Sequence, residues 1–192
     1  DLAGNRETVV SDDGSSSTFT YDALRRLTEE EHLAPGGAVT AAFSYDYDAV
    51  GNRVSMTDAG GATATYTYDE ADRLVTAGAS TYHHDLNGNV VGVETGGSVE
   101  SYAYDARNRM VAATVPGTGT TTYDWNALGD RVRSTNAGES TNLLVDPLDA
   151  SGVSQVLAEY DDAGAVTATY VHGLDLVSQD VGGVVSFAAT DL

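Results

Sequence analysis

The stretch that decides the fold is Tyr45-Asp46-Tyr47-Asp48-Ala49-Val50-Gly51-Asn52-Arg53-Val54. Tyr45 and Tyr47 are two residues apart, so in a strand both rings lie on one face of the sheet. Asp48 can accept hydrogen bonds from the backbone of a turn that it opens, and Gly51 tolerates a positive φ. The chain becomes extended again from Arg53. The stretch therefore predicts a strand, a tight turn and a second strand.

The same pattern returns along almost the whole chain. The copies are residues 1–6 (truncated), 19–27, 45–54, 66–74, 82–90, 102–110, 123–132 and, more weakly, 160–166. The second ring of each copy falls at positions 21, 47, 68, 84, 104, 125 and 160, so most steps are near 20 residues. Such a period suits two short strands and two turns per repeat. Since His84 and Trp125 replace tyrosine, this position requires a flat ring rather than a phenol.

Each residue type in the pattern has a physical reason to recur. Paired rings can stack on the rings of the next repeat, and the aspartate accepts turn amides. The arginines at positions 6, 26, 53, 73, 109 and 131 are expected to close the turn, and to pair with a neighbouring aspartate or lie across a ring. We expect a structural role, not a chemical one, for Tyr21, Asp22, Arg26, Tyr47, Asp48, Gly51, Arg53, Tyr68, Asp69, Arg73, His84, Asp85, Gly88, Tyr104, Asp105, Arg109, Trp125, Asn126, Gly129, Arg131, Tyr160, Asp161 and Gly164.

Other segments lie between the copies or depart from their period. Glycine-rich turns at 58–61, 95–97 and 116–119 are expected at the opposite ends of the hairpins. The longest helix candidate is 21–33, with glutamates at 29–31, although it overlaps a repeat turn. Residues 28–42 read as an inserted linker, and 134–159 as a longer spacer. A final hairpin is expected around Gly182-Gly183.

The composition favours an all-β protein with an acidic surface. The chain has 192 residues, 21 of them glycine, and a net charge of −20; its nine basic residues are all arginine. Such a charge repels nucleic acid and anionic lipid, and no apolar run is long enough to span a membrane. With no cysteine, disulfides and thiolate metal sites are excluded. The chain opens and ends in mid-pattern, so we interpret it as a fragment of a longer protein.

Several patterns suggest chemistry, but a structural role explains each of them better. His83 and His84 are consecutive in a strand and face opposite ways, so they do not easily share a metal ion. His32 and His172 are isolated. The Asp85 and Asp48 turns lack the twelve-residue spacing of a calcium loop. No serine has a nucleophile-elbow setting or an evident His–Asp partner set. Tyrosine-rich surfaces can also bind sugars, which stays open as an alternative.

The repeated phrases Tyr-Asp-x-x-Gly-Asn-Arg-Val and Tyr-Asp-x-x-Asp-Arg-Leu resemble the tyrosine-aspartate (YD) repeats of the Rhs family. That family includes bacterial polymorphic toxins, shell proteins of insecticidal toxin complexes, and teneurins. The resemblance covers residues 1–175, and residues 170–192 resemble the lead-in to the Rhs core. It implies a β-ribbon that spirals into a hollow shell around a toxin. The self-cleavage motif and the effector of the toxin members are not in this sequence, so the resemblance assigns no catalytic residue.

The sequence thus predicts an all-β array of antiparallel YD hairpins at 1–175, followed by the start of a core-like hairpin at 176–192. We expect a non-enzymatic wall or scaffold segment of a secreted or cell-surface bacterial protein, with no cofactor. Its partners are neighbouring repeats of the parent chain and an enclosed toxin. The alternative is an extracellular adhesin or filament-forming ribbon that binds glycans or self-associates through strand edges. An enzyme domain is the least favoured hypothesis.

Overall fold

The computed structural model describes residues 4–147, 153–172 and 176–188. Residues 1–3 of the first copy, 173–175 beside the expected boundary at 175, and 189–192 of the core-like segment lie outside the described residues. The described chain consists of strands and turns, which confirms the all-β prediction. None of its segments is a helix that could cross a membrane.

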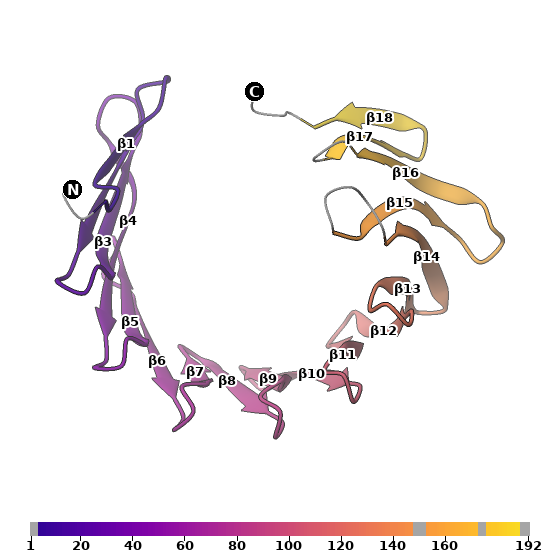
Figure 1. The fold of residues 1–192 in the computed structure, drawn as a ribbon. Coiled ribbons are helices and arrows are strands. Elements are labelled where there is room, and N and C mark those ends of the chain that lie inside the picture. The colour runs from indigo at the N-terminus through magenta and orange to yellow at the C-terminus, as the bar shows by residue number, and fades with distance from the viewer. Residues whose placement is uncertain (1–3, 148–152, 173–175, 189–192) are drawn as a thin grey trace. The chain divides into compact units, whose positions relative to one another are not determined.

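Eighteen strands are present in the described residues, and Figure 1 shows them in chain order. They are β1 (Thr8–Val10), β2 (Ser16–Tyr21), β3 (Leu27–Leu33), β4 (Val39–Tyr47), β5 (Arg53–Asp58), β6 (Thr63–Tyr68), β7 (Leu74–Ala77), β8 (Ser80–His84), β9 (Val90–Thr95), β10 (Ser98–Tyr104), β11 (Met110–Val115), β12 (Gly119–Trp125), β13 (Arg131–Asn136), β14 (Glu139–Asp146), β15 (Gln155–Tyr160), β16 (Val166–His172), β17 (Leu176–Val181) and β18 (Val184–Phe187).

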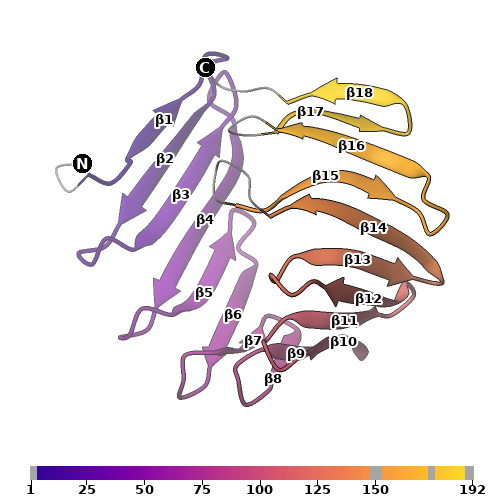
Figure 2. The same ribbon diagram turned by 45° about the vertical axis from the view of Figure 1, so that its right-hand side comes forward.

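The chain divides into two compact units, which are described separately. The first contains residues 1–83 and 93–97, and the second contains 84–92 and 98–192. In the first unit each strand from β1 to β8 pairs antiparallel with the next. In the second unit the strands from β10 to β18 pair in the same way, as the successive arrows in Figure 2 show. The division at residue 175, which follows the family resemblance, remains a prediction.

Two expectations about the early chain were wrong. The helix candidate 21–33 is a turn followed by strand β3, because the chain reverses at 22–26 and residues 27–33 pair with both β2 and β4. The linker 28–42 is a hairpin of β3 and β4 around a turn at 34–38. The turns expected near 58–61 and 116–119 do join antiparallel hairpin strands, β5 with β6 and β11 with β12, and the turn at 95–97 connects β9 to β10 along the chain.

The two faces of the sheet differ in chemistry within each unit. Along β6 and β12 the residues alternate between exposed and half-buried, and the half-buried positions hold the rings. We call the face that carries these rings the ring face. The opposite face bears hydroxyl pairs such as Thr57–Thr63 (2.9 Å) and Thr67–Thr76 (2.7 Å). This alternation is typical of a sheet in which one face is better covered than the other.

No conventional hydrophobic core is present in the described residues. Among the residues that the structure describes, Ala168 (4% exposed) is the one hydrophobic residue that is fully buried, and no large side chain is less than 2% exposed. No second layer covers the sheet in the described part of the chain, so burial of large apolar groups cannot be the main support of these strands. The sheet must be held by strand pairing and by contacts from one repeat to the next.

The conformation of the turn at Gly51 gives a direct test. Gly51 has a φ of +106°, and a Cβ there would meet no atom within 4 Å. We expect Gly51→Ala to lower the free energy of unfolding by about 1–2 kcal/mol, through backbone strain and not through a clash. Urea unfolding followed by circular dichroism measures this. The neighbouring Val50, which is 74% exposed, supplies the control, since Val50→Ala should change stability by less than about 0.5 kcal/mol. Equal effects at the two positions would contradict this account.

Candidate functional site

The turns after the signature rings share one hydrogen-bonding scheme. In the turn at 48–52 the amide of Asp48 donates to the carbonyl of Asn52, and the amide of Gly51 donates to the carbonyl of Asp48. The carboxylate Oδ1 of Asp48 accepts the amides of Val50 and Asn52. The side chain thereby satisfies amides that the turn would otherwise leave to solvent. The same scheme occurs in the turns at 22–26, 69–73, 85–89, 105–109 and 126–130.

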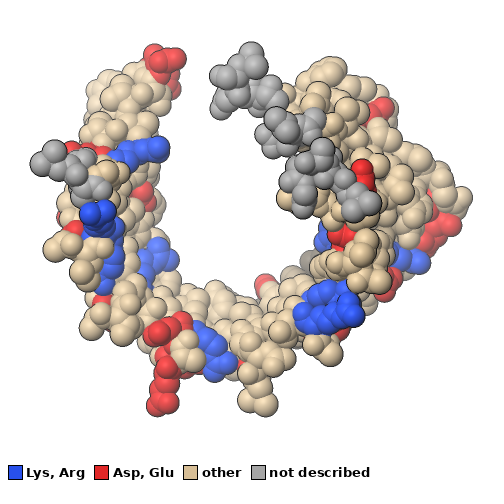
Figure 3. Space-filling model, in the orientation of Figure 1, with Lys and Arg blue, Asp and Glu red and all other residues tan. Residues whose placement is uncertain are grey.

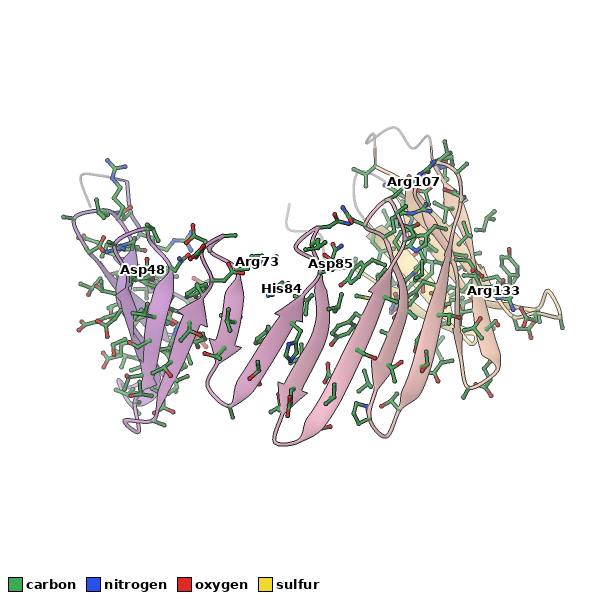
Figure 4. The ribbon with its side chains drawn as sticks, turned by 90° about the horizontal axis from the view of Figure 1, so that it is seen from below. Asp48, Arg73, His84, Asp85, Arg107 and Arg133 are labelled. Carbon is green, nitrogen blue, oxygen red and sulfur yellow. The ribbon has the colours of Figure 1, made fainter. Side chains whose placement is uncertain are left out.

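These six turns, which we call the YD turns, lie at one end of the strands in each unit. Two strands separate each YD turn from the next, so the chain returns to the same edge every time. In Figure 4, Asp48 and Arg73 lie at one end of the strands of the first unit, and Asp85 and Arg107 lie at one end of the strands of the second.

Hydrogen bonds to the turn carboxylates favour their charged form. The guanidinium and amide of Arg109 hold the pKa of Asp105 down at about 2, despite the opposing effect of desolvation. The pKa of Asp22 and that of Asp69 are lowered chiefly by the amides of Arg26 and Arg73. The side-chain amide of Asn89 lowers the pKa of Asp85. These aspartates are therefore fixed acceptors at neutral pH, and they are poorly suited to proton transfer.

The YD turns are of two kinds, which alternate along the chain. One kind ends in arginine and has a non-glycine residue at positive φ; its turns are 22–26, 69–73 and 105–109, with Arg25, Asp72 and Asn108 at that position. The other kind has glycine at positive φ followed by Asn or Asp; its turns are 48–52, 85–89 and 126–130, with Gly51, Gly88 and Gly129. We call them arginine turns and glycine turns. In the truncated first copy, Gly4 has a φ of +85° and precedes Asn5, as the glycine does in the glycine turns.

Each kind of turn contacts the next one differently. From the arginine turns, Arg26 Nη1 donates to the carbonyl of Asp48 (2.9 Å), and Arg109 Nη1 donates to the carbonyl of Asn126 (3.2 Å). From the glycine turns, Asn52 Nδ2 donates to Asp72 Oδ1 (2.9 Å). In the same way Asn87 and Asn89 donate to Asn108 Oδ1 at 3.1 and 3.0 Å. The acceptors Asp72 and Asn108 are the positive-φ residues of their arginine turns, where a glycine would offer no side-chain acceptor.

Within a turn, the first and last side chains form a matched pair. In arginine turns the pair is an ion pair: Arg26–Asp22 (2.7 Å), Arg73–Asp69 (2.7 Å) and Arg109–Asp105 (2.6 Å). In glycine turns it joins an amide to a carboxylate, as in Asn52–Asp48 (3.1 Å) and Asn89–Asp85 (2.9 Å). The turn at 126–130 reverses the two partners, because Asn126 Nδ2 donates to Asp130 Oδ2 (2.9 Å).

This reversed pair predicts a non-additive double substitution. Asn126→Asp alone should destabilise the protein, because two carboxylates would then face each other. Adding Asp130→Asn restores the order found at Asp48 and Asn52, so the double variant should recover most of the lost stability. Thermal unfolding of the two single variants and the double variant measures the coupling between the sites. Additive losses would show that the two side chains act independently.

The signature rings join each repeat to the one before it. The hydroxyls of Tyr21, Tyr47 and Tyr68 donate to the carbonyls of Arg6 (3.0 Å), Leu27 (2.7 Å) and Arg53 (2.9 Å). Trp125 Nε1 donates to the carbonyl of Met110 at 2.9 Å. A β-bulge at the ring position accompanies each of these bonds and turns the side chain along the sheet. Tyrosine, tryptophan and histidine all carry the polar hydrogen that such a bond uses.

The arginines divide into two groups, and this differs from the expectation that all six close a turn. Arg26, Arg73 and Arg109 do close their turns. Arg53 and Arg131 instead begin strands β5 and β13, one residue beyond the turn. The guanidinium carbon of Arg53 lies 4.6 Å from the centroid of the Tyr66 ring and 5.5 Å from that of Tyr45, and Arg131 lies 5.5 Å from Tyr123. Arg26 also stacks, 4.7 Å from the Tyr47 ring. These cation–π contacts cover the rings that no second layer covers.

The YD turns lie at one end of the strands, which we call the YD edge. The eighth copy does not lie at this edge. Asp161 does organise a turn of the same type, in which its carboxylate accepts the amides of Ala163 and Ala165 and Gly164 has a φ of +84°. Three strands, however, separate this turn from the one at 126–130, so Tyr160, Asp161 and Gly164 lie at the opposite ends of the strands. The Asp58 turn at that edge has the same bonds without a ring before it.

The ring position at the YD edge continues at His172, so the prediction that His172 is isolated is wrong. Its Nε2 lies 2.8 Å from the carbonyl of Val156, and a bulge precedes it as at Tyr47. Tyr170 stands two residues before it, which repeats the spacing of Tyr45 and Tyr47. One strand pair earlier, the bulge falls at Val145, so an aliphatic residue fills the position there. The ring-x-ring spacing at 170–172 was the available signal.

The described residues contain no group of three or more His, Asp or Glu side chains arranged for a metal ion. His84 occupies the ring position of β8 and is half-buried, whereas His83 is exposed. Acidic and basic side chains are neighbours on the face seen in Figure 3, where most of the surface is formed by other residues. The geometry as a whole is that of a laterally repeating sheet, and its polar groups join one repeat to the next.

Comparison with known families agrees with this geometry. The sequence matches the family model described as Teneurin YD-shell over residues 4–144. The chain belongs to the YD-shell family. This confirms the family inferred from the repeats.

Solved structures support the fold of this YD-shell chain. It is similar to a crystal structure of TcdB2-TccC3 without the hypervariable C-terminal region, with a TM-score of 0.55 and 16% identity over 75% of this chain and 9% of that one. It is also similar to the crystal structure of TcdB2-TccC3-Cdc42, with a TM-score of 0.50 and 14% identity over 90% of this chain and 13% of that one. The YD-shell chain thus spans a small part of these proteins. A search of curated proteins gives no match.

Proposed function

We propose that this chain is a non-enzymatic wall segment of a larger secreted or cell-surface YD-shell protein that encloses a toxin. The observation that carries the proposal is the ladder of bonds between successive YD turns. The turns at 48–52 and 105–109 each accept a bond from the preceding YD turn and donate one to the following YD turn, so the arrangement extends a sheet sideways and does not converge on a site. Membership of the YD-shell family and the similarity to TcdB2-TccC3 support the same role.

The near absence of buried large side chains also favours a wall over an independent domain. A sheet with no core has little to gain from closing on itself as a separate globule. As part of a long array, it gains contacts at both of its lateral edges. We therefore expect the neighbouring repeats of the parent chain to be its principal partners, with the enclosed toxin as a second partner.

Electron microscopy of the parent protein tests this proposal. A short epitope inserted at Gly117, in a hairpin turn away from the YD edge, marks the segment. We expect hollow particles with the bound antibody fragment on their wall, and an internal segment that resists added protease until the particle is unfolded. Filaments with the epitope repeated along them would instead favour the self-associating ribbon, and glycan binding without a particle would favour the adhesin. Either result would overturn the shell proposal.

A further inference from the structure

Four polar side chains on the ring face of the first unit form a connected group that the repeat pattern does not require. Ser17 lies on β2, Glu30 and His32 on β3, and Tyr45 on β4. Ser17 is directly opposite His32 in the strand register, and Glu30 is directly opposite Phe43, two residues before Tyr45. Their positions are thus fixed by the pairing of three adjacent strands.

The distances link these groups in one order. Ser17 Oγ is 2.8 Å from His32 Nδ1, and His32 Nε2 is 3.6 Å from Glu30 Oε2. The other carboxylate oxygen of Glu30, Oε1, accepts a hydrogen bond of 2.5 Å from the Tyr45 hydroxyl. Phe19 sets its ring edge-on to the imidazole, with the centroids 6.2 Å apart. This arrangement is not evident in the sequence, because residues 17, 30 and 32 are brought together only by the pairing of β2 with β3.

The carboxylate of Glu30 determines which groups in this cluster donate hydrogen bonds and which accept them. Burial and the bond to Glu30 raise the pKa of Tyr45 to about 12, so Tyr45 remains a donor. A carboxylate near His32 Nε2 favours the tautomer that carries its proton there. His32 Nδ1 then has a free lone pair and accepts the proton of the Ser17 hydroxyl. A nucleophile (Ser17), a base (His32) and a group that orients the base (Glu30) therefore lie next to one another in this order.

We propose that Ser17 is an acylation site, at which its hydroxyl takes an acyl group from an activated ester. Ser17 Oγ attacks the ester carbonyl carbon, and its proton passes to His32 Nδ1. The new bond joins Oγ to the acyl carbon, the bond from that carbon to the leaving oxygen breaks, and the leaving group departs as an alkoxide or phenolate. Glu30 is a positioning residue, since it holds the imidazolium that forms.

We expect one modification per chain and little turnover. β2 pairs with β1 on one side and with β3 on the other, so its backbone amides are engaged in strand pairing. Two free amide donors for a developing oxyanion are what fast acyl transfer and deacylation need. The site is open to a small ester because the His32 side chain is 36% exposed. Stoichiometric acylation is compatible with a shell protein that is not an enzyme.

The complete chain treated with p-nitrophenyl acetate provides the test. The protein has no lysine, so the usual amine background is confined to its N-terminus. We expect about one equivalent of rapid p-nitrophenolate release and an acetyl group on the peptide that contains Ser17. Ser17→Ala should abolish this release, and His32→Gln should slow it on the order of 100-fold, in line with the effect of a general base. Glu30→Gln should slow it less.

Ser55→Ala is the matched control, because Ser55 is bonded to the carboxylate of Asp46 (2.7 Å) with no histidine between them. This variant should react like the unchanged protein. Circular dichroism of each variant verifies that the sheet persists. Acetylation spread over several serines and tyrosines, or a rate at Ser17 that His32→Gln leaves unchanged, would overturn the proposal.

Discussion

Replacing Tyr47 with alanine should lower the free energy of unfolding by about 3 kcal/mol, which is at the lower end of the cost of removing a large aromatic side chain. The ring is half-buried on the ring face, its hydroxyl donates to the carbonyl of Leu27 at 2.7 Å, and the guanidinium of Arg26 stacks 4.7 Å from its centroid. All three contributions join the second repeat to the third. Tyr47→Phe keeps the ring and the stacking, so it should cost only about 1 kcal/mol through the unsatisfied carbonyl.

Urea unfolding monitored by circular dichroism and by tyrosine fluorescence measures both variants. Thr65, an exposed residue on the opposite face of β6, provides the control, and Thr65→Ala should cost less than about 0.5 kcal/mol. If Tyr47→Ala and Thr65→Ala were equally mild, strand pairing alone would hold the repeats together. If Tyr47→Phe were as damaging as Tyr47→Ala, the hydroxyl bond would be the dominant contribution.

The sheet should lose structure in acid between about pH 4 and pH 2. The pKa of Asp105 falls from 3.8 to about 2 on folding, and those of Asp22, Asp48, Asp69 and Asp85 are also lowered. A carboxyl group with a depressed folded pKa contributes its full stability above the unfolded value and loses that contribution as the pH falls through the folded value. Because five YD turns share this behaviour, the loss should be large and should develop over a narrow range.

Far-ultraviolet circular dichroism from pH 7 to pH 1.5 follows this transition. The triple substitution Asp22→Asn, Asp69→Asn and Asp105→Asn removes three of the titrating groups, so the variant should be less stable at pH 7 and should depend less on pH below 4. Acid also relieves the general repulsion among the negative charges of a chain with net charge −20. High salt already screens that repulsion at neutral pH, so the same titration at low and high salt separates it from the loss of the turn hydrogen bonds. An intact sheet at pH 1.5 would contradict the role assigned to the turn carboxylates.

Local sequence was sufficient to predict the hairpins and the turn aspartates. The Tyr-x-Tyr spacing, the Asp that follows and the glycine three residues later act within a single turn, so residues 45–54 already contain the information. The same logic identified the family. It failed at 21–33, where three successive glutamates suggested a helix. In β3 these side chains alternate between the two faces, and Glu30 is held on the ring face by the Tyr45 hydroxyl.

What could not be predicted depends on the neighbouring repeat or on the number of strands. Arg26 and Asn52 hold similar places in their turns, but their partners, the carbonyl of Asp48 and the carboxylate of Asp72, belong to the following turn. Tyr160 precedes a turn of the usual type. That turn lies at the opposite ends of the strands, because an odd number of strands separates it from the turn that begins at Asn126. His172 has the ring-x-ring spacing but no turn aspartate after it, and its bond to the carbonyl of Val156, 16 residues earlier, is seen only in the folded sheet.

The alternation of arginine turns and glycine turns imposes a rule of parity on the array. Removing one repeat brings two turns of the same kind together. Where the removed turn is an arginine turn, a glycine then faces the asparagine that needs a side-chain acceptor. Removing two consecutive repeats leaves every donor opposite its proper acceptor. A wall of this construction can therefore be lengthened or shortened without a mismatch only in steps of two repeats, and recombination between related chains is expected to preserve an even count.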